Sequence, residues 1–144
     1  MTATRARKTR ARSGISVQRA ARGAPAARTL LRFARAAAPP SSRTTLRVVG
    51  AAEARRLNFA FRRRNYATNV LSFSYGPGVG DVVLCHPVIV REAREQGKAL
   101  AAHYAHLVVH GLLHLRGRKH GKNMERTEIR ILRRLGYADP YTVK

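Results

Sequence analysis

Apolar side chains surround most of the helix that the sequence predicts over residues 98–115. A helix at the surface of a domain carries a single apolar stripe, whereas a helix that is apolar on most sides is buried. Other elements must therefore pack around this segment, which makes it the strongest constraint on the fold. Its C-terminal half and the turn after it carry three histidines, His110, His114 and His120.

The spacing of these histidines predicts a metal site. Residues four apart lie on one face of a helix, so the imidazoles of His110 and His114 can reach one ion. Gly117 allows a sharp turn that brings His120 back as a third ligand. A single histidine in an apolar helix is more simply a core residue, but three at this spacing indicate one Zn²⁺ ion. Three imidazoles leave the fourth tetrahedral position open for water, which is typical of catalytic zinc.

Two further side chains could hydrogen-bond a metal ligand. His106 lies one helical turn before His110 on the same face, where it could line the pocket or pack in the core. Asp81 follows Gly80 near the start of a predicted strand, and it could orient a ligand or only a turn. Cys85, at the end of that strand, is predicted to be a small buried residue.

Length and cysteine content limit the class of protein. A chain of 144 residues fits one domain. Its single cysteine excludes an intrachain disulfide and a cysteine-based zinc site, which favours a reducing compartment. No run of about 18 apolar residues occurs, and the start lacks an apolar secretory stretch. We therefore expect a protein of the bacterial cytoplasm with no membrane contact, and an organelle is the second possibility.

The charge balance predicts an anionic partner. The chain has 29 Lys and Arg residues against 7 Asp and Glu, a net charge of +22, and no acidic residue precedes Glu53. Such an excess repels itself unless a polyanion is near. Its spread along the whole chain favours nucleic acid over a membrane surface, and a coding bias toward arginine and alanine is the alternative. Residues 1–13 are predicted to form a disordered basic arm.

Residues 14–144 are predicted to form one α/β (α+β) domain, with a small mixed four-stranded sheet flanked by helices. The central helix of this domain carries the histidines. Strands are predicted where alternating or β-rich runs occur, at 15–19, 44–49, 69–75 and 81–85. Glycines at 76–80 make the last two strands a hairpin. Helices are predicted at 26–38, 51–58, 87–96, 98–115 and 124–135.

The neighbours of the histidines argue against one class of zinc enzyme. Zinc proteases with this histidine spacing carry a glutamate directly after the first histidine, as the general base. This chain has Gly111 there, and no carboxylate occurs between Glu95 and Glu125. A metal-activated water beside positive charge instead suits attack on a phosphodiester, because a guanidinium stabilises the negative charge that develops in the transition state.

Several segments together are similar to one family. The motifs TNVLSF at residues 68–73 and HGLLHLRGRKH at residues 110–120 occur in this order, after a stretch that contains Arg62. Over residues 14–144 the chain resembles the YbeY family, the bacterial and organellar zinc endoribonucleases of ribosomal RNA maturation. The two motifs are specific when they occur together.

The resemblance implies a chemistry and a set of partners. Cleavage of single-stranded RNA is expected, in maturation of the 3′ end of small-subunit ribosomal RNA and in ribosome quality control. By position, the zinc ligands would be His110, His114 and His120, and Arg62 would clamp the scissile phosphate. RNA is the expected partner, together with the ribosome or ribosomal proteins, and no DNA is expected.

Two positions depart from the pattern of the family. Lys119 stands where the family has an acidic residue before its third histidine, and Asn65 stands in place of an aspartate. Loss of a carboxylate that orients a ligand weakens metal affinity by about 10- to 100-fold. In return, added cations would draw RNA closer, and Arg63, Arg64 and Lys119 are candidates for RNA contacts.

The sequence supports two functions. The first is a zinc-dependent endoribonuclease, and the alternative is a ribosome-associated RNA-binding or assembly factor whose metal site is structural or vestigial. Aromatic residues fit either function, since Tyr66, Phe73 and Tyr75 could stack on bases or pack against the protein.

Overall fold

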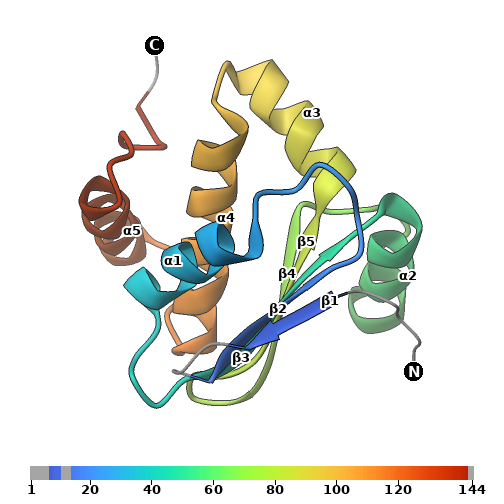
Figure 1. The fold of residues 1–144 in the computed structure, drawn as a ribbon, viewed down its shortest axis with the longest axis horizontal. Helices are drawn as coiled ribbons and strands as arrows, with labels where there is room; N and C mark the ends of the chain where they lie inside the picture. The colour runs from blue at the N-terminus through green and yellow to red at the C-terminus, as the bar shows by residue number, and fades with distance from the viewer. Residues whose placement is uncertain (1–6, 11–13, 143–144) are drawn as a thin grey trace.

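The computed structural model of the chain describes residues 7–10 and 14–142. These residues form a single mixed sheet covered by helices on both faces (Figure 1). In chain order the elements are β1 (Arg7–Arg10), β2 (Ile15–Arg19), α1 (Ala27–Ala37), β3 (Arg43–Val49), α2 (Ala51–Arg62), β4 (Val70–Gly76), β5 (Val79–Cys85), α3 (His86–Gln96), α4 (Leu100–Leu115) and α5 (Lys122–Arg134).

The sheet has the strand order β1-β2-β3-β5-β4. Strands β2, β3 and β5 run parallel, whereas β1 and β4 pair antiparallel at the two edges. Strands β4 and β5 form the predicted hairpin, with an irregular register between Ser74 and Gly76. The predicted α/β fold and its mixed sheet are therefore confirmed, and within the described residues one edge of β4 is unpaired.

The sheet has one strand more than the four that the sequence predicts. The additional strand, β1, lies in the segment 1–13 that the sequence suggests to be a disordered arm, of which residues 1–6 and 11–13 lie outside the described residues. Its sequence, RKTR, contains no apolar residue. An edge strand held by backbone hydrogen bonds to β2 needs no alternating apolar pattern, so periodicity could not reveal it.

The two faces of the sheet bury separate sets of side chains. Along β5, Val82 and Leu84 belong to the main core under α1, α4 and α5, whereas Val83 and Cys85 belong to a smaller core under α2. This division follows from the strand geometry, because successive side chains point to opposite faces. The buried position of Cys85 agrees with its predicted role as a small core residue.

Helix α4 occupies the centre of the larger core, as its sequence predicts. It packs between the sheet and the helices α1 and α5 (Figure 1), and buried side chains occur on nearly every turn, including Tyr104, Val108 and Leu112. Within the described residues, none of the helices has both the length and the apolar content needed to cross a membrane.

Helix α2 is one turn longer than predicted and places Arg62 at its C-terminal end. The sequence suggests an end near Asn58, but this residue is fully buried and its side-chain amide donates to the backbone oxygen of Tyr66. The residue after the helix, Arg63, forms its C-terminal cap and adopts the left-handed conformation with a φ of 59°. That conformation is usual for glycine, so the sequence shows no recognisable stop signal here.

Candidate functional site

The structure brings the three predicted metal ligands together. His110 and His114 lie one turn apart near the C-terminal end of α4. The chain then turns at Gly117, whose φ of 86° favours glycine, and returns His120 to the same place. One nitrogen from each of the three rings lies within 4.8 Å of the others.

The hydrogen bonds of His110 and His114 fix which ring nitrogens are free. Nδ1 of His110 faces a carboxylate oxygen of Glu128 at 2.5 Å, and Nδ1 of His114 faces the backbone oxygen of Arg118 at 3.1 Å. Both partners only accept hydrogen bonds, so each neutral ring carries its proton on Nδ1 and has a lone pair on Nε2.

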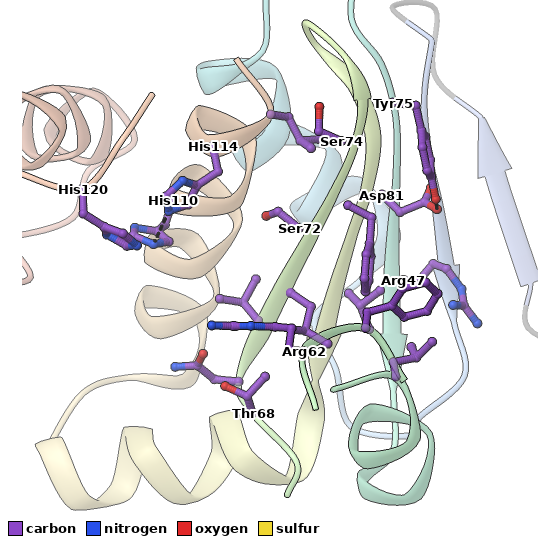
Figure 2. Close-up of a pocket in the computed structure, with 18 residues that line it drawn as sticks. Arg47, Arg62, Thr68, Ser72, Ser74, Tyr75, Asp81, His110, His114 and His120 are labelled. Carbon is purple, nitrogen blue, oxygen red and sulfur yellow. Dashed lines mark hydrogen bonds between the residues drawn. The ribbon is translucent and has the colours of Figure 1, made fainter. Parts of the chain in front are cut away.

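The two Nε2 atoms nevertheless lie only 3.1 Å apart (Figure 2). Two lone pairs at this distance repel each other unless a cation lies between them. Nitrogens bound tetrahedrally to one Zn²⁺ at 2.0–2.1 Å would be about 3.3 Å apart, close to the observed separation. Burial lowers the pKa of His114, and the adjacent His110 and His120 lower it further, which keeps this ring neutral, as a metal ligand must be. The donor set therefore fits a divalent metal ion.

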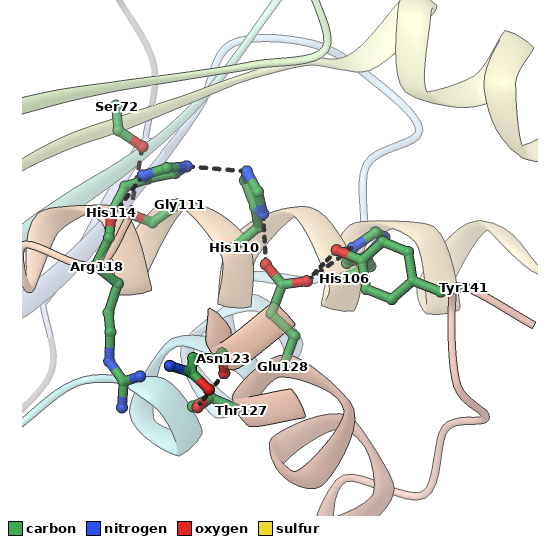
Figure 3. A network of polar contacts seen from close by, with 10 residues as sticks. All are labelled: Ser72, His106, His110, Gly111, His114, Arg118, Asn123, Thr127, Glu128 and Tyr141. Carbon is green, nitrogen blue, oxygen red and sulfur yellow. Dashed lines mark hydrogen bonds and ion pairs between the residues drawn. The ribbon is translucent and has the colours of Figure 1, made fainter. Parts of the chain in front are cut away.

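Glu128 on α5 is the buried partner of the histidines. Its side chain is fully buried, and it accepts hydrogen bonds from His110 and from the hydroxyl of Tyr141 (Figure 3). His106 Nε2 lies 3.4 Å from the same carboxylate and 3.2 Å from the Tyr141 hydroxyl. Burial alone would raise the pKa of Glu128, but the hydrogen bonds from His106, His110 and Tyr141 outweigh it and lower the pKa to about 2.

This carboxylate is the functional residue that the sequence did not reveal. The family pattern suggests an acidic residue beside the third histidine, where Lys119 is exposed instead. Glu128 supplies a carboxylate from another helix, and it holds the proton on Nδ1 of His110 so that Nε2 stays available to a metal. The only signal in the sequence is that this acidic residue lies four residues from Met124 and from Leu132, on one face of the helix. In the structure Met124, Glu128 and Leu132 are all buried.

The other suggested hydrogen-bond partner, Asp81, lies elsewhere. Its carboxylate accepts a hydrogen bond from the hydroxyl of Tyr75 at 3.0 Å, and both residues lie across the sheet edge from the histidines (Figure 2). His106, in contrast, reaches His110 through Glu128, as described above.

A groove of about 970 Å³ crosses the edge strand β4 and opens onto the three histidines. The histidines form one side, and the end of α2 with the outer part of β4 forms the other. Arg62 lines the groove between them and extends its guanidinium toward the histidine side (Figure 2). Arg63, Arg64 and Lys119, the other suggested RNA contacts, are exposed but do not line this groove.

Gly111 packs against the sheet where the related proteases carry their glutamate. A Cβ atom on Gly111 would lie 2.7 Å from Cγ1 of Val82 and 3.2 Å from Oγ of Ser72. Ser72 also donates to the backbone oxygen of Gly111 at 3.3 Å. No glutamate side chain fits here without moving β4 or β5, so the structure adds a steric reason to the chemical one for excluding the protease arrangement.

A second polar network joins one residue that lines the groove to the helices α3 and α4. Asn69 in the TNVLSF motif donates to Glu92 at 3.0 Å, and His103 Nε2 lies 2.8 Å from the same oxygen. Nδ1 of His103 is buried and has no hydrogen-bond partner among the described residues. Burial lowers the pKa of His103, although the hydrogen bond and charge of Glu92 oppose this effect, so the neutral ring is favoured.

Comparison with known proteins identifies the family. The model of the family described as Endoribonuclease YbeY matches residues 13–136. A protein named Endoribonuclease YbeY from Aromatoleum aromaticum is 47% identical, over 90% of this chain and 93% of its own length. One with the same name from Azoarcus sp. is 49% identical over 88% of this chain, which spans 59% of that relative.

A solved structure supports the fold independently. The solution structure of TM1509 from Thermotoga maritima superposes with a TM-score of 0.56 at 24% identity, and it covers 81% of this chain and 88% of its own. The match of the family model over most of the chain, together with relatives near half identity, carries the assignment. The chain belongs to the YbeY family of endoribonucleases, which are RNA-cleaving hydrolases.

Proposed function

We propose that this protein is a metal-dependent endoribonuclease that uses one Zn²⁺ ion held by His110, His114 and His120. The observation that carries the proposal is the pair of Nε2 lone pairs of His110 and His114 facing each other at 3.1 Å. When bound in such a site, zinc acts as a Lewis acid and lowers the pKa of water toward 7.

The residues around the histidines have separate tasks in this proposal. Glu128 orients His110 and stabilises it as a ligand through the proton on Nδ1. Arg62 binds the scissile phosphate, because its guanidinium can donate two parallel hydrogen bonds to phosphate oxygens. As the negative charge on these oxygens grows in the transition state, the same contact becomes stronger, which lowers the barrier.

RNA is the substrate that the groove and the charge favour. A net charge of +22 attracts a polyanion, and the relatives named above are endoribonucleases. Within this class we propose single-stranded ribosomal RNA, with maturation of the 3′ end of the small-subunit RNA and ribosome quality control as the cellular tasks. The ribosome or ribosomal proteins would then be partners, and the bacterial cytoplasm the location, in keeping with the bacterial sources of these relatives.

One experiment separates the enzyme from a non-catalytic RNA-binding factor. Purified protein and a His114→Ala variant are incubated with single-stranded RNA, with and without a chelator, and bound zinc is measured in both. We expect cutting by the native protein alone, lost on chelation and restored by zinc. Equal cutting by both proteins would indicate a contaminating nuclease, and RNA binding without cutting would favour the assembly factor.

A further inference from the structure

The groove has two chemically different sides. The histidines lie on one side, and Arg62 extends its guanidinium toward them, an arrangement suited to a metal ion and a phosphate, whereas Tyr75 lies on the opposite side (Figure 2). Phe61 and Phe73 also line the groove. Phe61 and Tyr75 are 66% and 69% exposed, which makes them the most exposed large apolar side chains among the described residues. Among the described residues, neither ring belongs to the packed core on either face of the sheet.

The aromatic side is built from two elements that hold the rings in place. Phe61 lies on the last turn of α2, and Phe73 lies on β4. Their ring centroids are 5.1 Å apart with an interplanar angle of 64°, the edge-to-face geometry that aromatic pairs prefer. Phe73 is half-buried against the smaller core. It therefore packs between this core and Phe61 and holds the Phe61 ring in place, while that ring stays exposed.

A carboxylate in the same part of the groove indicates which part of an RNA strand could lie there. Asp81 lines the groove and accepts a hydrogen bond from Tyr75. The nearby cation, Arg47, is already paired with Glu53 at 2.6 Å. An aspartate repels a phosphate group but accepts hydrogen bonds from the N–H groups of a base, and it has acceptor capacity beyond the one bond to Tyr75. Exposed rings beside a carboxylate therefore suit a base, not the sugar-phosphate backbone.

We propose that Phe61, Tyr75 and Asp81 form a binding site for an unpaired nucleobase, next to the phosphate held by Arg62. This inference rests on the proposed function, because it takes RNA as the ligand of the groove. A base can stack on these rings only after it has left a duplex. The site thus favours single-stranded RNA over double-stranded RNA and sets the position of the strand relative to the histidines.

The chain offers a matched pair of variants to test this site. Phe61 and Phe59 lie on the same helix and are both exposed, at 66% and 50%, but only Phe61 lines the groove. Two residues apart on a helix, they point to opposite sides. Phe61→Ala therefore removes the proposed platform, Phe59→Ala controls for the loss of an exposed ring, and Phe61→Tyr keeps the ring at the site.

The experiment places the fluorescent base 2-aminopurine at one position at a time in a short single-stranded RNA. The RNA is mixed rapidly with the metal-loaded full chain, and emission is followed in the phase before cutting. Stacking on an aromatic ring quenches this base. We expect quenching at one position with the native protein, Phe59→Ala and Phe61→Tyr, and no quenching there with Phe61→Ala. Since stacking on one aromatic contributes about 1–3 kcal/mol, Phe61→Ala should bind this RNA about 5- to 160-fold more weakly.

An abasic nucleotide at the quenched position completes the test. It should weaken binding by the native protein and by Phe59→Ala, but it should not weaken Phe61→Ala further, because the contact is already lost. Equal behaviour of Phe61→Ala and Phe59→Ala, or no quenching at any position, would overturn the base site and leave the exposed rings to a protein partner. Cutting without quenching removes the base site but not the enzyme, whereas quenching without cutting removes the enzyme but not the base site.

Discussion

The contact between Glu128 and His110 should determine how tightly the metal is bound. We consider Glu128→Gln, which keeps the shape of the side chain but removes its negative charge. In the native protein this fully buried carboxylate, with a pKa of about 2, accepts hydrogen bonds from His110 and Tyr141 and lies 3.4 Å from His106. An amide offers only one oxygen to these donors, and its NH₂ group would face at least one of them.

The magnitude follows from the kind of contact that is lost. A hydrogen bond to a charged group contributes about 1.5–3 kcal/mol, and replacing a partner of a metal-binding histidine typically weakens metal affinity by about 10- to 100-fold. The two ranges agree, because each tenfold change in affinity corresponds to about 1.4 kcal/mol. We therefore expect Glu128→Gln to bind zinc about 10- to 100-fold more weakly than the native protein.

The assay is competition for zinc with a coloured chelator of known affinity at pH 7. Glu125→Gln is the matched control, since Glu125 lies on the same helix and is exposed, and its zinc affinity should be unchanged. Circular dichroism establishes that each variant is folded at the assay temperature. A folded Glu128→Gln protein whose zinc affinity stays within twofold of the native value would refute the role of this carboxylate.

Three further perturbations follow from the site. Gly111→Ala forces a Cβ atom to 2.7 Å from Cγ1 of Val82. The variant should be less stable, because overpacking costs about 1–3 kcal/mol and the gain in helix propensity is at most about 1 kcal/mol. Equal or higher stability of the variant in urea unfolding would contradict this contact. Burial lowers the pKa of His103 below its ordinary value of 6.5, so the unfolded chain binds more protons than the native state and the free energy of unfolding should fall as the pH drops below about 6.5. His103→Gln should reduce this slope in urea unfolding at pH 7.5, 6.5 and 5.5, and an unchanged slope would assign it to other groups. Arg62→Ala should lower the cleavage rate by about 10²- to 10³-fold without changing zinc content, whereas Arg64→Ala, outside the groove, should weaken RNA binding only slightly; equal rates for the two variants would remove Arg62 from the site.

Local features of this chain could be predicted well from its sequence. The helix 100–115 and the shared face of its histidines can be recognised from the spacing of residues three to four apart. The turn after the helix can be recognised from one glycine, which has a positive φ. The hairpin of β4 and β5 likewise follows from β-rich runs around a glycine-rich turn. These elements obey local rules of periodicity and turn chemistry, which a single sequence displays directly.

Features that depend on tertiary packing could not be predicted in this way. The last helix buries the charged residue Glu128 together with Ile131, and it leaves the apolar Ile129 half-exposed. The energetic reason is specific to the fold, because the buried carboxylate is balanced by hydrogen bonds from His110 and Tyr141. Since those donors come from other segments of the chain, the residues around Glu128 could show at most its place on an apolar helix face and could not show these partners.

The aromatic side of the groove shows the same limit. The sequence allowed Phe73 and Tyr75 either to pack in the core or to face a ligand, and alternation along a strand cannot decide between these possibilities at a sheet edge. The structure gives the two residues different environments, because Phe73 is half-buried and Tyr75 is exposed. Phe61 gave no signal, because the helix that presents it extends beyond the end that its sequence predicts.

The central claim is that one ion held by His110, His114 and His120 enables RNA cleavage. The most direct test strips the protein of metal, adds zinc in small steps, and measures bound zinc and the cleavage rate of single-stranded RNA on the same samples. We predict that activity rises in proportion to bound zinc and stops rising at one ion per chain, while His114→Ala stays inactive throughout. Full activity in the stripped protein, or activity unrelated to bound metal, would contradict this account.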